Sequence, residues 1–182
     1  MLFRSWFGFF TTISSEFSTS FWSAALLSDR TNASAAFSTL CVAALGSGFG
    51  IGRWFIPIWM RKTTLDVRLK SILTIQFVSF MLFWLSHNLV FSLIMLLFVG
   101  IGISGQFPMT MVRLMKLSEG KPDLAMGKAA YAAGAAIALA PFLLGFFGDQ
   151  IGISKAYLMV PVLIALSFGA ILLSSLQELK QR

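Results

Sequence analysis

Charged residues are scarce in this chain of 182 residues: they make up 12% of it, whereas an ordinary soluble domain carries about 25%. Hydrophobic residues make up 57%, which is more apolar surface than a soluble domain of this size can bury. The composition therefore excludes a soluble enzyme, a disordered chain and a collagen-like fibre. We expect the lipid bilayer as the main partner and no nucleic acid, in spite of a net charge of +7.

Strict alternation of apolar and polar residues, the pattern of a membrane β-strand, is missing from the apolar runs. The runs are long and continuous, as a membrane-spanning helix of about 20 residues requires. The sequence therefore predicts an all-α membrane protein, formed by one domain over residues 1–182. Dividing the chain at its polar connections gives six transmembrane helices, at 5–27, 34–59, 69–86, 89–112, 124–147 and 155–176.

Basic residues are distributed unequally between the two sides of the predicted bundle. Of the 14 lysines and arginines, 12 lie before the first span, around the second and fourth connections or in the tail. Only Arg30 and Lys155 lie on the opposite side. Since lysine and arginine accumulate in cytoplasmic loops, both termini are expected in the cytoplasm of a multi-pass protein. Residues 61–70 hold four basic residues and one acidic one, a looser group than the polybasic patches that bind lipid headgroups.

Histidine and cysteine are represented by one residue each, His87 and Cys41. A lone cysteine forms no intrachain disulfide, and one histidine with one cysteine does not make a zinc site. We therefore expect no metal and no cofactor. The stretch Gly102-Ile-Ser104-Gly105 resembles the nucleophile motif of rhomboid intramembrane proteases, which need a histidine on their sixth helix. Because no histidine follows His87, the chain is not expected to be an enzyme.

The first span is the most polar of the six. Nine hydroxyl or carboxyl side chains crowd into 13 positions, and Thr12, Glu16, Ser20 and Ser23 recur on one helical face. Glu16 lies at the middle of the span, where a carboxyl group costs about 2.5–3.5 kcal/mol on insertion scales. Two interpretations stay open: Glu16 binds and releases a proton in a polar cavity, or it is a protonated side chain bonded to a neighbouring helix.

The fourth span is interrupted by residues that weaken a helix. Gly100, Gly102, Gly105 and Pro108 make its backbone deformable, because proline removes a backbone donor. Such segments often hold binding sites or hinges in transporters, and the amide of Gln106 offers both a donor and an acceptor. A kink that serves packing alone is the alternative interpretation.

Other candidate residues lie in the second and fifth spans. Tyr131 is able to stack on or hydrogen-bond a solute, and Pro141 adds a second candidate hinge. Arg53, near the cytoplasmic end of the second span, either reaches outward, satisfies helix-end carbonyls or pairs with a carboxylate. The same span contains glycines at the Gly-x-x-x-Gly spacing of closely packed helices, Gly46 with Gly50 and Gly48 with Gly52.

Weak internal symmetry divides the chain into residues 1–87 and 88–182. Glu16 and Gln106 lie 90 positions apart, and the second and fifth spans are both rich in small residues. Three spans per repeat is an odd number, so the two repeats must have opposite topology. The sequence therefore predicts 3+3 inverted repeats.

Four stretches together resemble the C-terminal six-helix half of a bacterial major facilitator superfamily transporter, in the sugar-permease branch that includes fucose permease relatives. They are residues 16–24, 50–53, 100–110 and 140–152. The resemblance implies secondary transport of a small solute across the inner membrane by alternating access, with proton coupling as an option. It implies that spans one, two, four and five line the cavity, with Glu16, Ser20, Gln106 and Tyr131 facing the solute and Trp22 capping the outer side. Gln76 and Ser79, on the third span, would then lie away from the solute.

The family has twelve spans, and its binding site lies between two six-helix halves. Three interpretations follow for a chain with six. It pairs with a separate N-terminal half, it forms a parallel homodimer, or it is a truncated, non-transporting membrane fragment or scaffold.

Overall fold

The computed structural model describes residues 2–32, 34–116, 118, 120 and 122–180. These residues are almost entirely helical and contain no strand. The helices are α1 (Leu2–Thr31), α2 (Ala35–Trp59), α3 (Leu65–Leu85), α4 (Leu89–Ile103), α5 (Gln106–Lys116), α6 (Pro122–Ile151), α7 (Ile153–Ala156) and α8 (Met159–Lys180). The predicted ranges are largely helical, and most helices extend a few residues beyond the predicted ends. The range 89–112 is divided at Ser104 and Gly105, and the range 155–176 is divided at Tyr157 and Leu158, so neither is the single helix that was predicted.

Five helical segments of the described chain are long and apolar enough to cross a membrane. They are Thr39–Trp59, Leu65–Leu85, Leu89–Lys116, Pro122–Ile151 and Ile153–Ser175. The chain is therefore compatible with a multi-pass membrane protein. Helix α1 has 30 residues, which is long enough, but its many hydroxyl groups and Glu16 make it less apolar than the other five segments.

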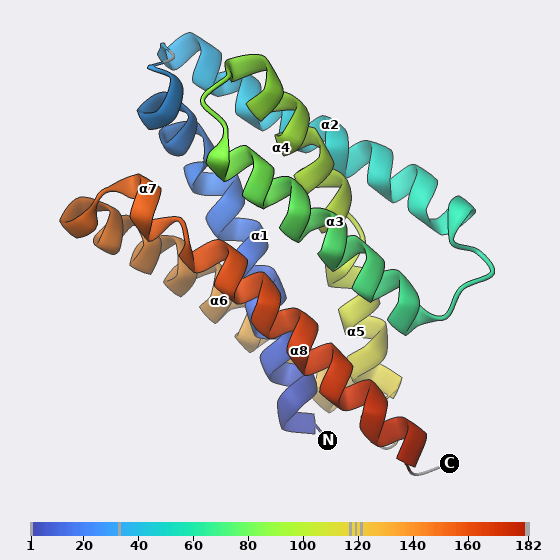
Figure 1. Cartoon of the computed structure of the whole chain (residues 1–182). Coiled ribbons are helices and arrows are strands. Elements are labelled where there is room, and N and C mark those ends of the chain that lie inside the picture. Colours follow the sequence, from blue (N-terminus) through green and yellow to red (C-terminus); the bar gives the residue numbers. More distant parts are fainter. Residues whose placement is uncertain (1, 33, 117, 119, 121, 181–182) are drawn as a thin grey trace.

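Helix α1 lies at the centre of the bundle (Figure 1). It packs along α6 and α8 and also contacts α2 and α5. Helix α4 packs along α2 and α3, and α3 in turn contacts α8. The first turns of α1 and the last turns of α8 lie at the same end of the bundle, which is also the end where α2 connects to α3 (Figure 1).

The central position of α1 explains its composition. Its hydroxyl side chains are at most 2% exposed at seven positions, namely Thr11, Thr12, Ser14, Ser15, Ser18, Thr19 and Ser23. Several donate to backbone carbonyls one turn earlier, as Thr12 does to Gly8 and Thr19 to Ser15, both at 2.7 Å. Others join α1 to its neighbours: Ser167 Oγ on α8 donates to Thr11 Oγ1 at 2.8 Å. The polar helix is thus surrounded by protein, and most of these hydroxyl groups bond to carbonyls of α1 itself or to neighbouring helices, whereas those of Ser14 and Ser18 have no partner among the described residues.

Two of the four glycines in α2 bring it close to α4. A Cβ atom on Gly48 would lie 1.9 Å from the Leu97 carbonyl oxygen, and one on Gly52 would lie 2.3 Å from Ser104 Oγ. Gly46 and Gly50 have nothing within 4 Å of such an atom. The packing role predicted from the glycine spacing is therefore confirmed for the pair Gly48 and Gly52 and is wrong for the pair Gly46 and Gly50.

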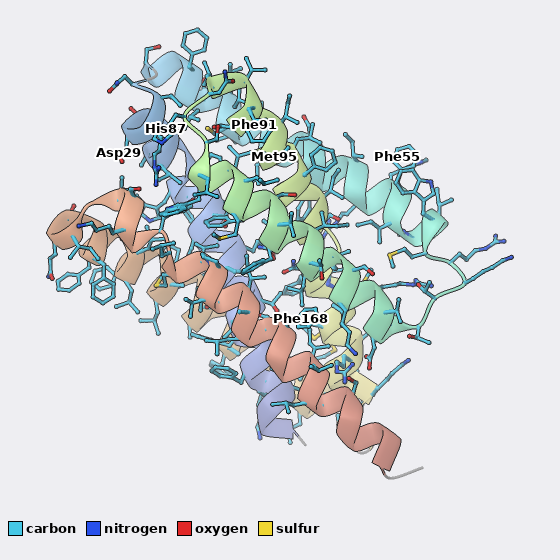
Figure 2. The ribbon with its side chains drawn as sticks, in the orientation of Figure 1. Asp29, Phe55, His87, Phe91, Met95 and Phe168 are labelled. Atoms are coloured by element: carbon cyan, nitrogen blue, oxygen red, sulfur yellow. The ribbon has the colours of Figure 1, made fainter. Side chains whose placement is uncertain are left out.

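Polar side chains join helices at both ends of the bundle. Near the α2–α3 connection, Arg113 of α5 pairs with Asp66 at the start of α3, and its Nη2 donates to Ser174 Oγ of α8 at 2.7 Å. At the opposite end, Arg30 Nη2 donates to Ser154 Oγ at 2.6 Å and the guanidinium lies over the Trp84 ring. Figure 2 shows His87 and Asp29 at this same end.

Candidate functional site at a helix break

The fourth span is divided into two helices. Helix α4 ends at Ile103 and α5 begins at Gln106, with Ser104 and Gly105 forming the turn between them. Pro108 explains part of this break, because it has no backbone N–H to donate to the carbonyl four residues earlier, that of Ser104. The break lies at the position where the sequence predicted a deformable segment.

Arg53 on α2 takes the place of the missing donor. Its Nε donates to the Ser104 carbonyl oxygen at 3.4 Å, and its guanidinium carbon lies 4.7 Å from the centre of the Phe49 ring. Of the three roles that the sequence left open for Arg53, satisfying a helix-end carbonyl is therefore the one that its hydrogen bond supports. The close approach of α2 at Gly52 brings the arginine to this position.

Glu16 on α1 carries the carboxyl group that the sequence singled out, and the described side chains show no ion pair between it and Arg53. Glu16 comes 15 residues before the end of α1, and Arg53 comes 18 residues after the start of α2. At about 1.5 Å per residue, the two side chains lie about 23 and about 27 Å from the end where α1 and α2 connect. Glu16 is half-buried and Arg53 is exposed, so neither charge is fully enclosed by the bundle.

Two buried amides lie on the other side of the break. Gln106 Nε2 donates to Gln76 Oε1 on α3 at 2.7 Å and to the Gly102 carbonyl at 2.9 Å. Gln76 Nε2 in turn donates to Ser15 Oγ on α1 at 3.3 Å. Both glutamines are fully buried, and Gln106 Oε1 has no hydrogen-bond partner among the described residues. The amides thus join four helices, α1, α3, α4 and α5, and reach α1 at Ser15, the residue before Glu16.

Gln76 is the member of this site that sequence reasoning missed. The resemblance placed the third span outside the cavity, whereas the structure buries Gln76 against Gly102, where a Cβ atom would lie 2.7 Å from Gln76 Cβ. The available signal was the amide itself, a strongly polar group in the middle of an apolar span. Such groups in membrane helices face other helices and find partners there.

We expect Gln106→Leu to destabilise the bundle by about 1–3 kcal/mol, because it leaves the buried Gln76 Oε1 without its donor. Unfolding of the detergent-solubilised protein by heat or by SDS measures the change. Gln150→Leu, at an exposed position of α6, is the matched control and should lose much less. Equal losses in the two variants would contradict a structural role for the amide pair.

The remaining predicted site residues are dispersed. Ser20 is exposed, and its hydroxyl donates to the Glu16 carbonyl at 2.9 Å. Trp22 Nε1 donates to the Pro141 carbonyl at 2.9 Å, so this side chain joins α1 to α6. Tyr131 is 84% exposed on α6 and has no hydrogen-bond partner among the described residues. The structure therefore brings Glu16, Arg53 and Gln106 around one break and leaves Tyr131 apart from them.

The predicted hinge glycines have different surroundings. Added Cβ atoms on Gly100 and Gly102 would lie 2.2 Å from the Leu45 carbonyl oxygen and 2.7 Å from Gln76, so both allow close helix contact. Gly105 lies in the turn itself, with the flexible end of Met109 as its nearest neighbour. Pro141 lies inside α6, which continues to Ile151. Of these positions, Gly105 together with Pro108 marks the actual break.

Within the described residues, no group of three or more histidine, cysteine, aspartate or glutamate side chains is placed to hold a metal ion. The site therefore consists of a carboxyl group, a guanidinium, amides and backbone carbonyls. Such groups bind polar solutes or protons through hydrogen bonds.

In comparisons with known proteins, no protein-family model matches the chain, and no curated protein matches it significantly.

Proposed function

We propose that this chain is one half of a major-facilitator-type secondary transporter, which moves a small solute across the bacterial inner membrane by alternating access. The observation that supports this proposal most is that Glu16 and Arg53 lie at similar depth in the bundle, the first half-buried and the second exposed. Charged side chains at this depth are costly in lipid, and they are almost always found facing a bundle interior or a water-filled cavity. The face that carries them is therefore the proposed wall of the transport pathway.

The proposal requires α1 to be a sixth membrane span. Its 30 residues correspond to about 45 Å, more than the thickness of the hydrocarbon core, and its hydroxyl groups are buried between neighbouring helices. An even number of spans puts both termini on one side of the membrane. This agrees with the first turns of α1 and the last turns of α8, which lie at the same end of the bundle (Figure 1). The predominance of basic residues at that end supports cytoplasmic termini.

Helix packing supports the inverted-repeat arrangement. In the proposed plan, α1 of the first repeat corresponds to α4 with α5 of the second, α2 to α6, and α3 to α8. The plan requires that a contact between α1 and α6 be matched by one between α4 and α2, and both are present. It also requires that the contact between α1 and α8 be matched by one between α4 and α3, and this pair is present too.

The partner half is proposed to be a second copy or a separate N-terminal half. Large aromatic side chains remain exposed on α2 and α6, the helices on either side of α1, with Trp54 at 70% and Tyr131 at 84%. Aromatic residues are enriched where protein surfaces meet. A Tyr131 that is 84% exposed within its own bundle is then explained as a residue that acts across the two halves.

We expect Glu16→Gln to abolish solute accumulation driven by a proton gradient, because the amide binds no proton. Purified protein in liposomes is given an imposed gradient and radiolabelled fucose or another hexose, and uptake is compared with equilibrium exchange. Exchange should persist in Glu16→Gln, since the amide still hydrogen-bonds a sugar hydroxyl. Asp149→Asn, an exposed carboxylate at the end of α6, is the control and should accumulate solute normally.

The same liposomes test the non-transporting alternative. A chain that stays monomeric and moves none of the sugars in either assay would contradict the transporter proposal for this chain on its own. Accumulation that survives Glu16→Gln would instead contradict the assignment of proton coupling to Glu16.

A further inference from the structure

A second feature of the membrane region lies between α3 and α8. These two helices enclose a groove of about 270 Å³, lined by Leu73, Thr74, Phe77, Ile164, Ala165 and Phe168. Phe168 comes from the middle of α8 (Figure 2). The single hydroxyl among the lining residues, that of Thr74, donates to the Lys70 carbonyl of its own helix at 2.8 Å. The lining therefore offers apolar surface alone to whatever occupies it.

A cation lies one helical turn beyond the groove-lining residue Thr74. Lys70 lies one turn before Thr74 on α3, and its Nζ donates to Ser175 Oγ of α8 at 3.3 Å. Lys70 lies five residues after the start of α3, or about 8 Å from the helix end at about 1.5 Å per residue. This depth matches the boundary between headgroups and acyl chains for a helix that spans the bilayer.

The carboxylate on the same helix, that of Asp66, does not pair with Lys70. Asp66 lies one turn earlier on α3 and pairs with Arg113. Arg68 donates to the Arg61 carbonyl at 3.0 Å and to Thr63 Oγ1 at 3.4 Å, so it is held in the α2–α3 connection. Among the side chains that the structure describes, Lys70 has a serine hydroxyl as its hydrogen-bond partner and no carboxylate.

We propose that the groove between α3 and α8 binds an anionic phospholipid, with one acyl chain along the groove and the phosphate on Lys70. Two features together favour a lipid as the occupant. The groove is apolar and lies on membrane-spanning helices, and Lys70 lies near one end of it at headgroup depth. A water-soluble phosphate compound would make no use of the groove. A second copy of the chain seated on the same face would bury the groove but would provide no anion for Lys70.

The test compares lipids that differ only in the headgroup. Purified protein in detergent receives equimolar dioleoyl phosphatidylglycerol and dioleoyl phosphatidylcholine, and native mass spectrometry counts bound lipid and copies of the chain. We expect phosphatidylglycerol to be preferred about fivefold, the effect of one basic side chain near an anionic headgroup. Lys70→Gln should remove the preference. Lys62→Gln makes the same charge change at an exposed position of the α2–α3 connection and should keep it.

A second variant tests the groove itself. Ala165 is exposed on the wall of the groove, so Ala165→Phe should occupy the space and reduce the binding of both lipids without affecting the core. An unchanged preference for phosphatidylglycerol in Lys70→Gln would overturn the proposal, as would unchanged lipid binding in Ala165→Phe. A dimer that Ala165→Phe dissociates, in the absence of any lipid preference, would assign the groove to a second copy instead.

Discussion

Replacing Gly48 with alanine is expected to separate α2 from α4 and to destabilise the protein by about 1–3 kcal/mol. The added Cβ would lie 1.9 Å from the carbonyl oxygen of Leu97 and 3.1 Å from the backbone nitrogen of Ile101. Because both atoms belong to the backbone of α4, no side chain is able to rotate away, and the helices themselves have to move apart. We therefore expect a loss at the upper end of this range.

Gly50→Ala is the matched control for this prediction. The position lies two residues further along the same helix, and nothing lies within 4 Å of its added Cβ. Since alanine is about 1 kcal/mol more favourable than glycine inside a helix, this variant should be neutral or more stable. The two substitutions are chemically identical, so a difference between them reports on the helix contact alone.

The single cysteine provides a direct measurement. Cys41 is fully buried and belongs to the hydrophobic core through α2. Reaction of its thiol with N-ethylmaleimide should be slow in the parent protein and in Gly50→Ala, and faster in Gly48→Ala. Thermal unfolding in detergent measures the accompanying loss of stability. Equal labelling rates in all three proteins would show that α2 does not depend on close contact with α4.

Asp66→Ala is expected to cost about 3–5 kcal/mol, because it leaves the charge of Arg113 without its carboxylate in a nearly buried position. The Arg113 side chain is 6% exposed and that of Asp66 is 25% exposed. Arg113 also donates to Ser174 on α8, so the ion pair belongs to a contact among α3, α5 and α8. Loss of the carboxylate should therefore loosen three helices together.

The double variant Asp66→Ala with Arg113→Met distinguishes two causes of the lost stability. One is the Arg113 charge in the absence of Asp66, and the other is the lost packing of the two side chains. Removing both members also removes the guanidinium that has lost the Asp66 carboxylate, so stability should recover most of the loss. Asp29→Ala, an exposed aspartate at the other end of the bundle, should change stability by less than about 0.5 kcal/mol. A double variant as unstable as Asp66→Ala alone would show that the packing of the two side chains, and not their charge, holds the helices.

The helices of this fold were predictable because their ends carry local signals. Asn88 illustrates this: it lies in the predicted turn after the third span, and its Oδ1 accepts from the Phe91 backbone at 3.0 Å as the cap of α4. The break at Pro108 was predictable for the same reason, since a missing N–H is a property of the residue itself. Local chemistry was sufficient wherever the feature involves a single helix.

Features that depend on two helices were predicted less well. The Gly-x-x-x-Gly spacing occurs twice in α2, and nothing in the sequence says that Gly48 faces α4 while Gly50 faces away. Gln76 was missed because its partners, Gln106 and Ser15, lie 30 and 61 residues away. The six spans, the repeats and the transport function remain predictions, and the packing of α1 among its neighbours supports the first two.

The turn at Ser104 and Gly105 has a mechanical consequence. Helix α4, before the turn, packs closely against α2 at Gly100. Helix α5, after the turn, is bonded to α3 and α8 through Arg113. Helix α3 packs along α4 and also contacts α5, so it spans the break. A tilt of α5 relative to α4 therefore bends the chain at Ser104 and Gly105, and it acts on the bond from Arg53 to the Ser104 carbonyl and on the bond from Gln106 to Gln76.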